Sequence, residues 1–164
     1  MNLDDRIARL ERGIDALLHR LTALPSEALY QSPREGEWPV MSNLAHVVEM
    51  LPYWAHQAEH IAHQPGAPFG RTVDDPGRLE GIEQHARDAV DVIGQSLRAA
   101  LAETLHTLRA IPDSGWDLSG VHPLRGSMTA TEVLDALMVK HVEDHVSQID
   151  AALSALGYSP SQVP

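Results

Sequence analysis

Two histidines, His141 and His145, lie four residues apart near the end of the chain. Their neighbours follow a helical period, and side chains four residues apart on a helix lie on one face, a turn apart. Two imidazoles in this arrangement can bind one metal ion through their ring nitrogens. A chain of 164 residues with ten histidines forms such pairs by chance, however, so the pair alone fits two hydrogen-bonded core histidines equally well.

A third histidine, His46, lies far upstream in another segment with a helical period. If the two helices pack side by side in a bundle, their facing side chains reach a shared site in its core. A second pair, His56 and His60, does not fit the same ion, because His60 would lie about 21 Å from His46 along a straight helix. The sequence therefore predicts one metal site formed by His46, His141 and His145.

Three neutral imidazoles leave a coordination position of a divalent ion open, as in catalytic zinc sites. Such an ion lowers the pKa of a bound water molecule or thiol towards neutrality. Imidazole also suits nickel, iron and copper, so these ligands do not identify the metal. Tyr53 lies on the same predicted helix as His46. We expect it to line the pocket and assist proton transfer, with plain core packing as the alternative.

Histidines that bind metal usually donate their second ring N–H to an oxygen atom. Four side chains near the predicted ligands offer such an oxygen: Glu49, Glu143, Asp144 and Gln148. A solvated helix face is the alternative for Glu143 and Asp144, and we favour it for Glu143.

The remaining histidines with a candidate role lie outside this predicted site. His56, His60 and His63 fit a solvated helix end, with surface metal capture as the functional alternative. His122 lies in a predicted loop, where a fourth metal ligand is conceivable and an ordinary loop residue is the interpretation we favour.

Four segments with a helical apolar period must position these residues. They cover about residues 2–24, 39–61, 78–110 and 129–157. The first begins at the capping residue Asn2, and the last begins with a capping box at Thr129 and ends at Gly157. Pro52 lies within the second segment and predicts a kink, because the apolar period continues on both sides of it.

The third segment contains Gly81 and Gly94, so a short helix followed by a longer one from about Asp88 is the alternative to one long helix. Its predicted core positions are Val92, Leu97, Leu101, Leu105 and Leu108. Residues 27–30 predict a single helical turn, residues 64–76 and 113–127 predict loops, and no segment shows a strand pattern. The sequence therefore predicts an all-α fold: a single domain over residues 1–164, an antiparallel four-helix bundle with one long crossover connection.

The composition narrows the classes of partner. The formal net charge is −11, without a cluster of Lys or Arg, which disfavours binding to nucleic acid or to anionic membranes. The chain has no cysteine, so histidines and carboxylates are its strong metal ligands. We expect no signal peptide at the N-terminal residues, and no apolar run is long enough to span a bilayer. We therefore expect a cytoplasmic protein without membrane contact.

Two motifs carry a family resemblance. The first is Glu37-Trp38-Pro39-Val40 leading into Leu44-Ala45-His46-Val47, and the second is His141-Val142-Glu143-Asp144-His145 followed by Gln148-Ile149. They resemble the DinB-like superfamily of metal-binding four-helix bundles, which includes bacillithiol-transferase-type proteins. Helix order and chain length agree with that family over nearly the whole sequence. Pro39 and Pro52 depart from its pattern and bear on the angle at which His46 meets the site.

The resemblance implies that His46, His141 and His145 hold a divalent metal ion such as zinc, nickel or iron. The superfamily includes thiol-dependent S-transferases and isomerases, in which the metal activates a low-molecular-weight thiol. We therefore expect a metal-dependent, transferase-like enzyme for a small-molecule substrate, with such a thiol as candidate cosubstrate, and a homodimer, which is common among relatives. The alternatives are a non-catalytic, stress-related metal-binding protein and a structural homodimeric bundle.

Overall fold

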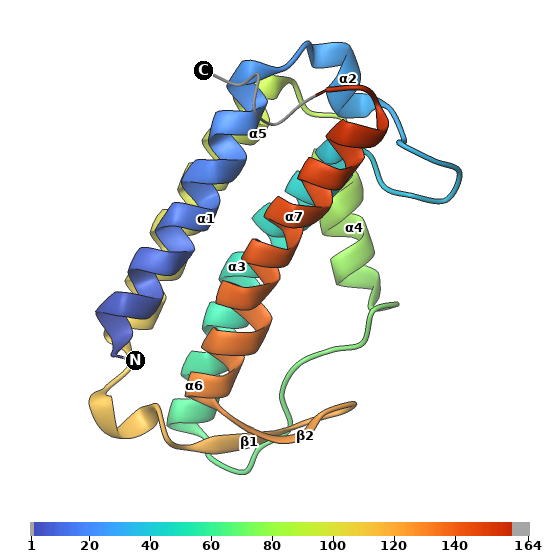
Figure 1. Cartoon of the computed structure of the whole chain (residues 1–164). Coiled ribbons are helices and arrows are strands. Elements are labelled where there is room, and N and C mark those ends of the chain that lie inside the picture. The colour runs from blue at the N-terminus through green and yellow to red at the C-terminus, as the bar shows by residue number, and fades with distance from the viewer. Residues whose placement is uncertain (1, 159–164) are drawn as a thin grey trace.

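Four long helices form most of the computed structural model, which describes residues 2–158 (Figure 1). They are α1 (Leu3–Ala23), α3 (Val40–His63), α5 (Val90–Ala110) and α7 (Lys140–Ala155). α1 and α7 run in one direction and α3 and α5 in the other, so the link between α3 and α5 returns along the bundle (Figure 1). This arrangement confirms the predicted all-α four-helix bundle with one long crossover connection.

The third predicted segment forms two helices, the alternative that its glycines favoured. α4 (Pro76–His85) lies within the crossover, and α5 follows after four residues. Along α5, Ile93 and Leu97 are fully buried, whereas Val92 is 42% exposed. The core prediction for Val92 is wrong because Val92 precedes Leu97 by five residues and lies off its face, while Ile93 precedes it by four.

A β-hairpin occupies much of residues 113–127, which were predicted to be a loop. After the short turn η1 (Asp113–Gly115), β1 (Ser119–His122) pairs antiparallel with β2 (Gly126–Thr129), with Ser119 opposite Thr129. The prediction of no strand is wrong because four-residue strands that each contain a glycine are too short to show an alternating pattern. The hairpin lies across one end of the bundle (Figure 1), and a bridge joins it to Pro68 in the crossover.

The last helical segment begins at Thr129, as predicted. The Thr129 hydroxyl accepts a hydrogen bond from the backbone N–H of Glu132 at 3.1 Å, and the Glu132 carboxylate accepts one from the backbone N–H of Thr129 at 2.8 Å. α6 (Ala130–Glu132) then passes into the π-helix η2 (Val133–Val139), which leads directly into α7. The π-helix was not predicted, and such wide turns are frequent near functional sites. Gly157, with a φ of 87°, lies just past the helix end.

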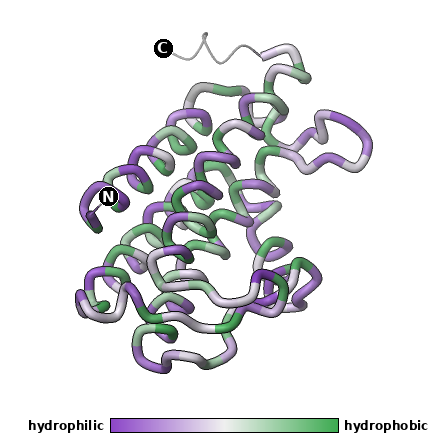
Figure 2. The backbone as a smooth tube through the Cα atoms, turned by 60° about the horizontal axis from the view of Figure 1, so that its bottom comes forward, coloured by the Kyte–Doolittle hydropathy of each residue, from purple (hydrophilic) through white to green (hydrophobic). Residues whose placement is uncertain are grey.

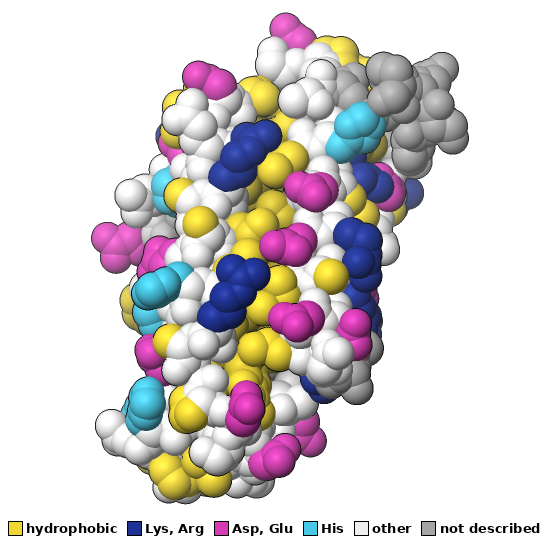
Figure 3. Space-filling view, turned by 90° about the vertical axis from the view of Figure 1, so that its left-hand side faces the viewer, with side chains coloured by type: hydrophobic (Ala, Val, Ile, Leu, Met, Phe, Trp, Pro, Cys, Tyr) yellow, Lys and Arg dark blue, Asp and Glu magenta, His cyan; other side chains and the backbone are white. Residues whose placement is uncertain are grey.

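The helices share one apolar core. Hydrophobic and hydrophilic residues alternate along them (Figure 2), and α3, which stays helical through Pro52, contributes the largest number of buried residues. On the left-hand side of Figure 1, a strip of hydrophobic side chains runs between basic and acidic ones (Figure 3).

No helix within residues 2–158 is both long enough and apolar enough to cross a membrane.

α1 fixes the position of the segment that carries His141 and His145. A Cβ atom at Gly13 of α1 would lie 2.6 Å from Val142 Cγ1, so the two backbones approach closely at this glycine. Three ion pairs with N–O distances of 2.7, 2.8 and 2.6 Å join α1 to η2 and α7: Arg6–Asp135, Arg9–Glu143 and Arg20–Asp150. Packing and ion pairs together hold the two histidines towards α3.

Candidate metal centre

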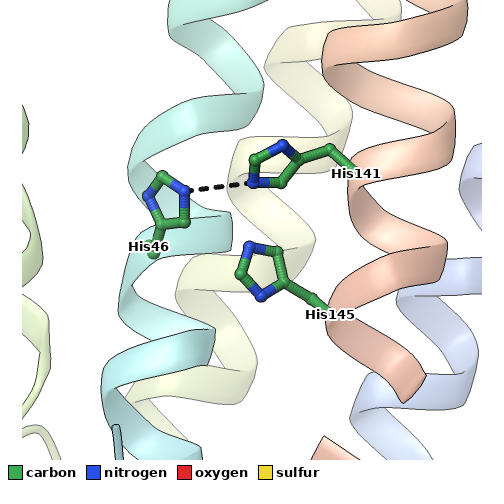
Figure 4. A group of neighbouring side chains, drawn as sticks. All are labelled: His46, His141 and His145. Carbon is green, nitrogen blue, oxygen red and sulfur yellow. Dashed lines mark hydrogen bonds between the residues drawn. The ribbon is translucent and has the colours of Figure 1, made fainter. Parts of the chain in front are cut away.

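The three predicted ligands meet in the core of the bundle. His46 comes from α3, and His141 and His145 come from successive turns of α7 (Figure 4). One ring nitrogen of each lies within 4.8 Å of those of the other two. Nε2 of His46 and Nε2 of His141 are 3.3 Å apart. The structure therefore brings together three imidazoles from segments that are distant in sequence.

The surroundings favour neutral imidazoles. Burial, followed by the charge of His46, lowers the pKa of His141 to about 4. Burial, followed by the charges of His141 and His46, lowers the pKa of His145 to about 3. Both rings are therefore neutral near pH 7, which is the form that binds a metal ion.

A hydrogen bond to Asn43 orients the ring of His145. Nδ1 of His145 lies 3.2 Å from the Asn43 amide oxygen, which fits an Nδ1–H donor, while Nε2 of His145 is buried without a hydrogen-bond partner. Nδ1 of His46 lies 3.6 Å from a Glu49 carboxylate oxygen, which is too far for a hydrogen bond, so this contact does not fix which nitrogen carries the proton. Metal–nitrogen bonds of 2.0–2.1 Å in a tetrahedral site place nitrogens about 3.3 Å apart. The donor set fits a divalent ion.

The four predicted supporting residues divide into two groups. Glu49 lies beside His46, and Gln148 lines the same hollow as His145. Glu143 instead pairs with Arg9 of α1, and Asp144 pairs with Lys140 at 2.7 Å on the exposed face of α7. The solvated face is therefore the observed setting of Asp144, whereas Glu143 is half-buried in an ion pair between α1 and α7.

Asn43 is a supporting residue that the sequence analysis missed. It is buried and lies one turn before His46 on the same face of α3. Its side-chain N–H groups donate to the Pro39 and Trp38 carbonyls at 3.0 and 3.4 Å, which fixes its oxygen towards His145. The three-residue spacing from His46 was the available signal, but an asparagine near a helix start is more often a cap.

Two hollows flank the three histidines. The larger hollow, of about 500 Å³, is lined by all three histidines and also by Trp38, Asn43 and Gln148. The smaller, of about 140 Å³, is lined by His46 and His141 but not by His145. The Trp38 ring meets the His46 ring edge-on at a centroid distance of 5.9 Å. The tryptophan of the first sequence motif thus forms a wall of the site.

Tyr53 lies outside both hollows and lines a separate surface pocket with Gln57 and His60. The Arg71 guanidinium lies 3.7 Å from the centre of its ring, and Arg71 in turn pairs with Glu49. Burial raises the pKa of the Tyr53 hydroxyl. The structure therefore connects Tyr53 to the histidines through Arg71 and Glu49.

His56 and His122 lie outside the cluster of three, although His122 lines the smaller hollow together with His46 and His141. His56 is exposed beside Glu59 and Glu103. His122 is buried at the end of β1, where its Nδ1 accepts backbone N–H groups from Leu124 and Arg125 at 3.1 and 3.3 Å. Among residues 2–158, the cluster of side chains suited to a metal ion contains His46, His141 and His145 alone.

The fold and the site define a four-helix bundle protein with a three-histidine cluster in its core. The family model of the DinB superfamily matches residues 9–149. The chain therefore belongs to the DinB superfamily, as its two motifs indicated. Among curated proteins, none matches the sequence.

Solved structures share this fold. YfiT from Bacillus subtilis, described as "a probable metal-dependent hydrolase with an unusual four-helix bundle topology", has a TM-score of 0.79 at 18% identity over 97% of this chain and 91% of that chain. The mycothiol-dependent maleylpyruvate isomerase has a TM-score of 0.71 at 18% identity, over 91% of this chain and 61% of its own. The four-helix bundle protein TT2238 has a TM-score of 0.61 at 21% identity, over 92% and 99%. This chain thus spans about three fifths of the isomerase, and these likenesses show the fold.

Proposed function

We propose that this chain is a divalent-metal-dependent enzyme acting on a small molecule, with His46, His141 and His145 as the metal ligands and a low-molecular-weight thiol as candidate cosubstrate. One observation carries the proposal. Three imidazoles from two helices converge in the core, and they border a hollow of about 500 Å³, a size suited to a small ligand. Zinc, nickel and iron all fit this set of nitrogens.

A bound divalent ion would lower the pKa of a thiol or water molecule that it contacts. The residues of this chain prepare the site for that role. The hydrogen bond to Asn43 favours the proton on Nδ1 of His145, which leaves Nε2 of that ring free for a metal ion. Trp38 forms one wall of the larger hollow that a ligand would enter.

Two similar structures support the reaction classes that we would test first. One is a mycothiol-dependent isomerase, which supports thiol chemistry, and the other is described as a probable metal-dependent hydrolase. Their low identity to this chain makes either activity a proposal here. Tyr53 as a proton-transfer group, the homodimer and the cytoplasmic location all stay predictions.

The test is turnover by the zinc-, nickel- or iron-loaded protein with a panel of thiols and electrophilic acceptors, and separately with ester and amide substrates. His141→Ala removes a proposed ligand, and His106→Ala, at an exposed position of α5, is the matched control. We expect turnover in the wild type and the control and its loss in His141→Ala. Equal turnover in all three proteins would refute the proposed role of the site. Stoichiometric metal binding without any turnover would favour the non-catalytic alternative.

A further inference from the structure

The smaller hollow, beside His46 and His141, is lined by three arginines: Arg71, Arg78 and Arg125. The chain has only 12 Lys and Arg residues against 23 Asp and Glu. Nevertheless, the described residues that line this hollow include no acidic side chain. The arginines beside the candidate metal centre therefore form a basic region in a protein whose net charge is negative.

Carboxylates compensate only one of these arginines. Arg71 pairs with Glu49 and lies 3.7 Å from Asp75, yet its Nε–H is buried without a hydrogen-bond partner. Arg78 donates to the Val73 carbonyl at 2.7 Å and faces the Trp38 ring at 5.6 Å.

Within residues 2–158, no carboxylate lies within ion-pair distance of the Arg78 or Arg125 guanidinium. Two positive charges at the hollow thus lack an ion-pair partner in the described part of the protein.

Their charges act on the metal centre. Both Arg78 and Arg125 contribute to the lowered pKa of His141, after the larger effects of burial and of His46. Burial also lowers the pKa of Arg78 itself, although the nearby Glu49 acts in the opposite direction. Arg78 is half-buried and Arg125 is exposed, and both can donate charge-assisted hydrogen bonds to a carboxylate that lies between them. The hollow, of about 140 Å³, has room for such a group but not for a large ligand.

We propose that the smaller hollow binds the carboxylate of an anionic organic substrate through Arg78 and Arg125, and so places the reacting part of that substrate beside His46, His141 and His145. The remainder of the molecule then extends into the larger hollow. This inference rests on the proposed function for its reacting centre and adds the class of substrate, a small organic acid. Arg71, held by Glu49, contributes its free Nε–H to the same group.

The test uses malonate as a probe for the full chain, titrated by calorimetry at low salt into metal-free and zinc-loaded protein. Malonamide is the uncharged control, and inorganic phosphate tests whether the hollow prefers an oxyanion other than a carboxylate. We expect malonate to bind to both forms and malonamide to neither. Arg78→Gln and Arg125→Gln should each weaken malonate binding by about tenfold or more. Arg109→Gln, at an exposed position of α5, should leave it unchanged.

Unchanged malonate affinity in folded Arg78→Gln and Arg125→Gln would overturn the inference, as would equal binding of malonamide. Phosphate binding tighter than malonate binding would overturn the assignment to a carboxylate. Zinc titrations of the same proteins separate this inference from the proposed function. Zinc binding without malonate binding refutes only the anion site, whereas malonate binding without zinc binding refutes only the metal centre.

Discussion

Acidification should weaken the fold of the metal-free protein well above the pH at which most carboxylates titrate. His141 and His145 have pKa values lowered from 6.5 to about 4 and about 3. Above pH 6.5 both rings are neutral in the folded and the unfolded chain. Below it, the unfolded chain takes up protons that the folded chain does not, so the free energy of unfolding falls as the pH falls from 6.5 towards 4.

The magnitude follows from proton linkage. Each proton taken up only by the unfolded chain changes the free energy of unfolding by about 1.4 kcal/mol per pH unit. Two histidines therefore set an upper limit of about 2.7 kcal/mol per unit. His141 is partly exposed, so solvent screening reduces its share, and we expect a loss of about 1–2 kcal/mol between pH 6 and pH 5. His122, whose pKa burial also lowers, changes stability in the same direction.

Urea unfolding at pH 7.5, 6 and 5, in the presence of a chelator, measures this loss. The double variant His141→Ala/His145→Ala should lose less stability per pH unit than the wild type, because the two titrating rings are absent. An equal free energy of unfolding at pH 6 and pH 5 in the wild type would refute the argument. An equal slope in the double variant would show that other groups cause the loss.

Three further substitutions test single features of the structure. Gly13→Ala should destabilise the protein by about 1–2 kcal/mol in urea unfolding, because its Cβ would meet Val142, and a more stable variant would contradict the close helix contact. Thr129→Ala should cost about 1 kcal/mol through the lost helix cap, and no change in the unfolding midpoint would contradict that role. Glu49→Gln should weaken zinc binding about 10- to 100-fold in competition with a chelator, and wild-type affinity would show that the carboxylate does not support His46.

The sequence was sufficient to predict the histidine cluster because two simple geometric rules apply to it. A four-residue spacing places His141 and His145 on one face, and antiparallel packing of two amphipathic helices brings His46 opposite them. The helix start at Thr129 was likewise predicted from a local hydrogen-bond pattern. These features depend on short-range periodicity and on the apolar faces of whole helices.

Features that depend on contacts between distant segments were not predicted. The hairpin that ends in His122 has strands too short to show a period, and it is held by pairing with the crossover. The hydrogen bond that His145 donates to Asn43 exists only because α3 and α7 pack together. Arg78 and Arg125 come from the crossover and the hairpin, so no local pattern indicates that they share a hollow.

Calorimetric titration of zinc into the metal-free, untagged protein tests the central claim most directly. The wild type should bind one Zn²⁺ per chain, and His46→Ala, His141→Ala and His145→Ala should each lose at least about 100-fold in affinity, as expected when one of three ligands is removed. His56→Ala, at an exposed position of α3, should bind zinc like the wild type. Wild-type affinity in His46→Ala, or no saturable binding in the wild type, would contradict a metal centre built from both helices.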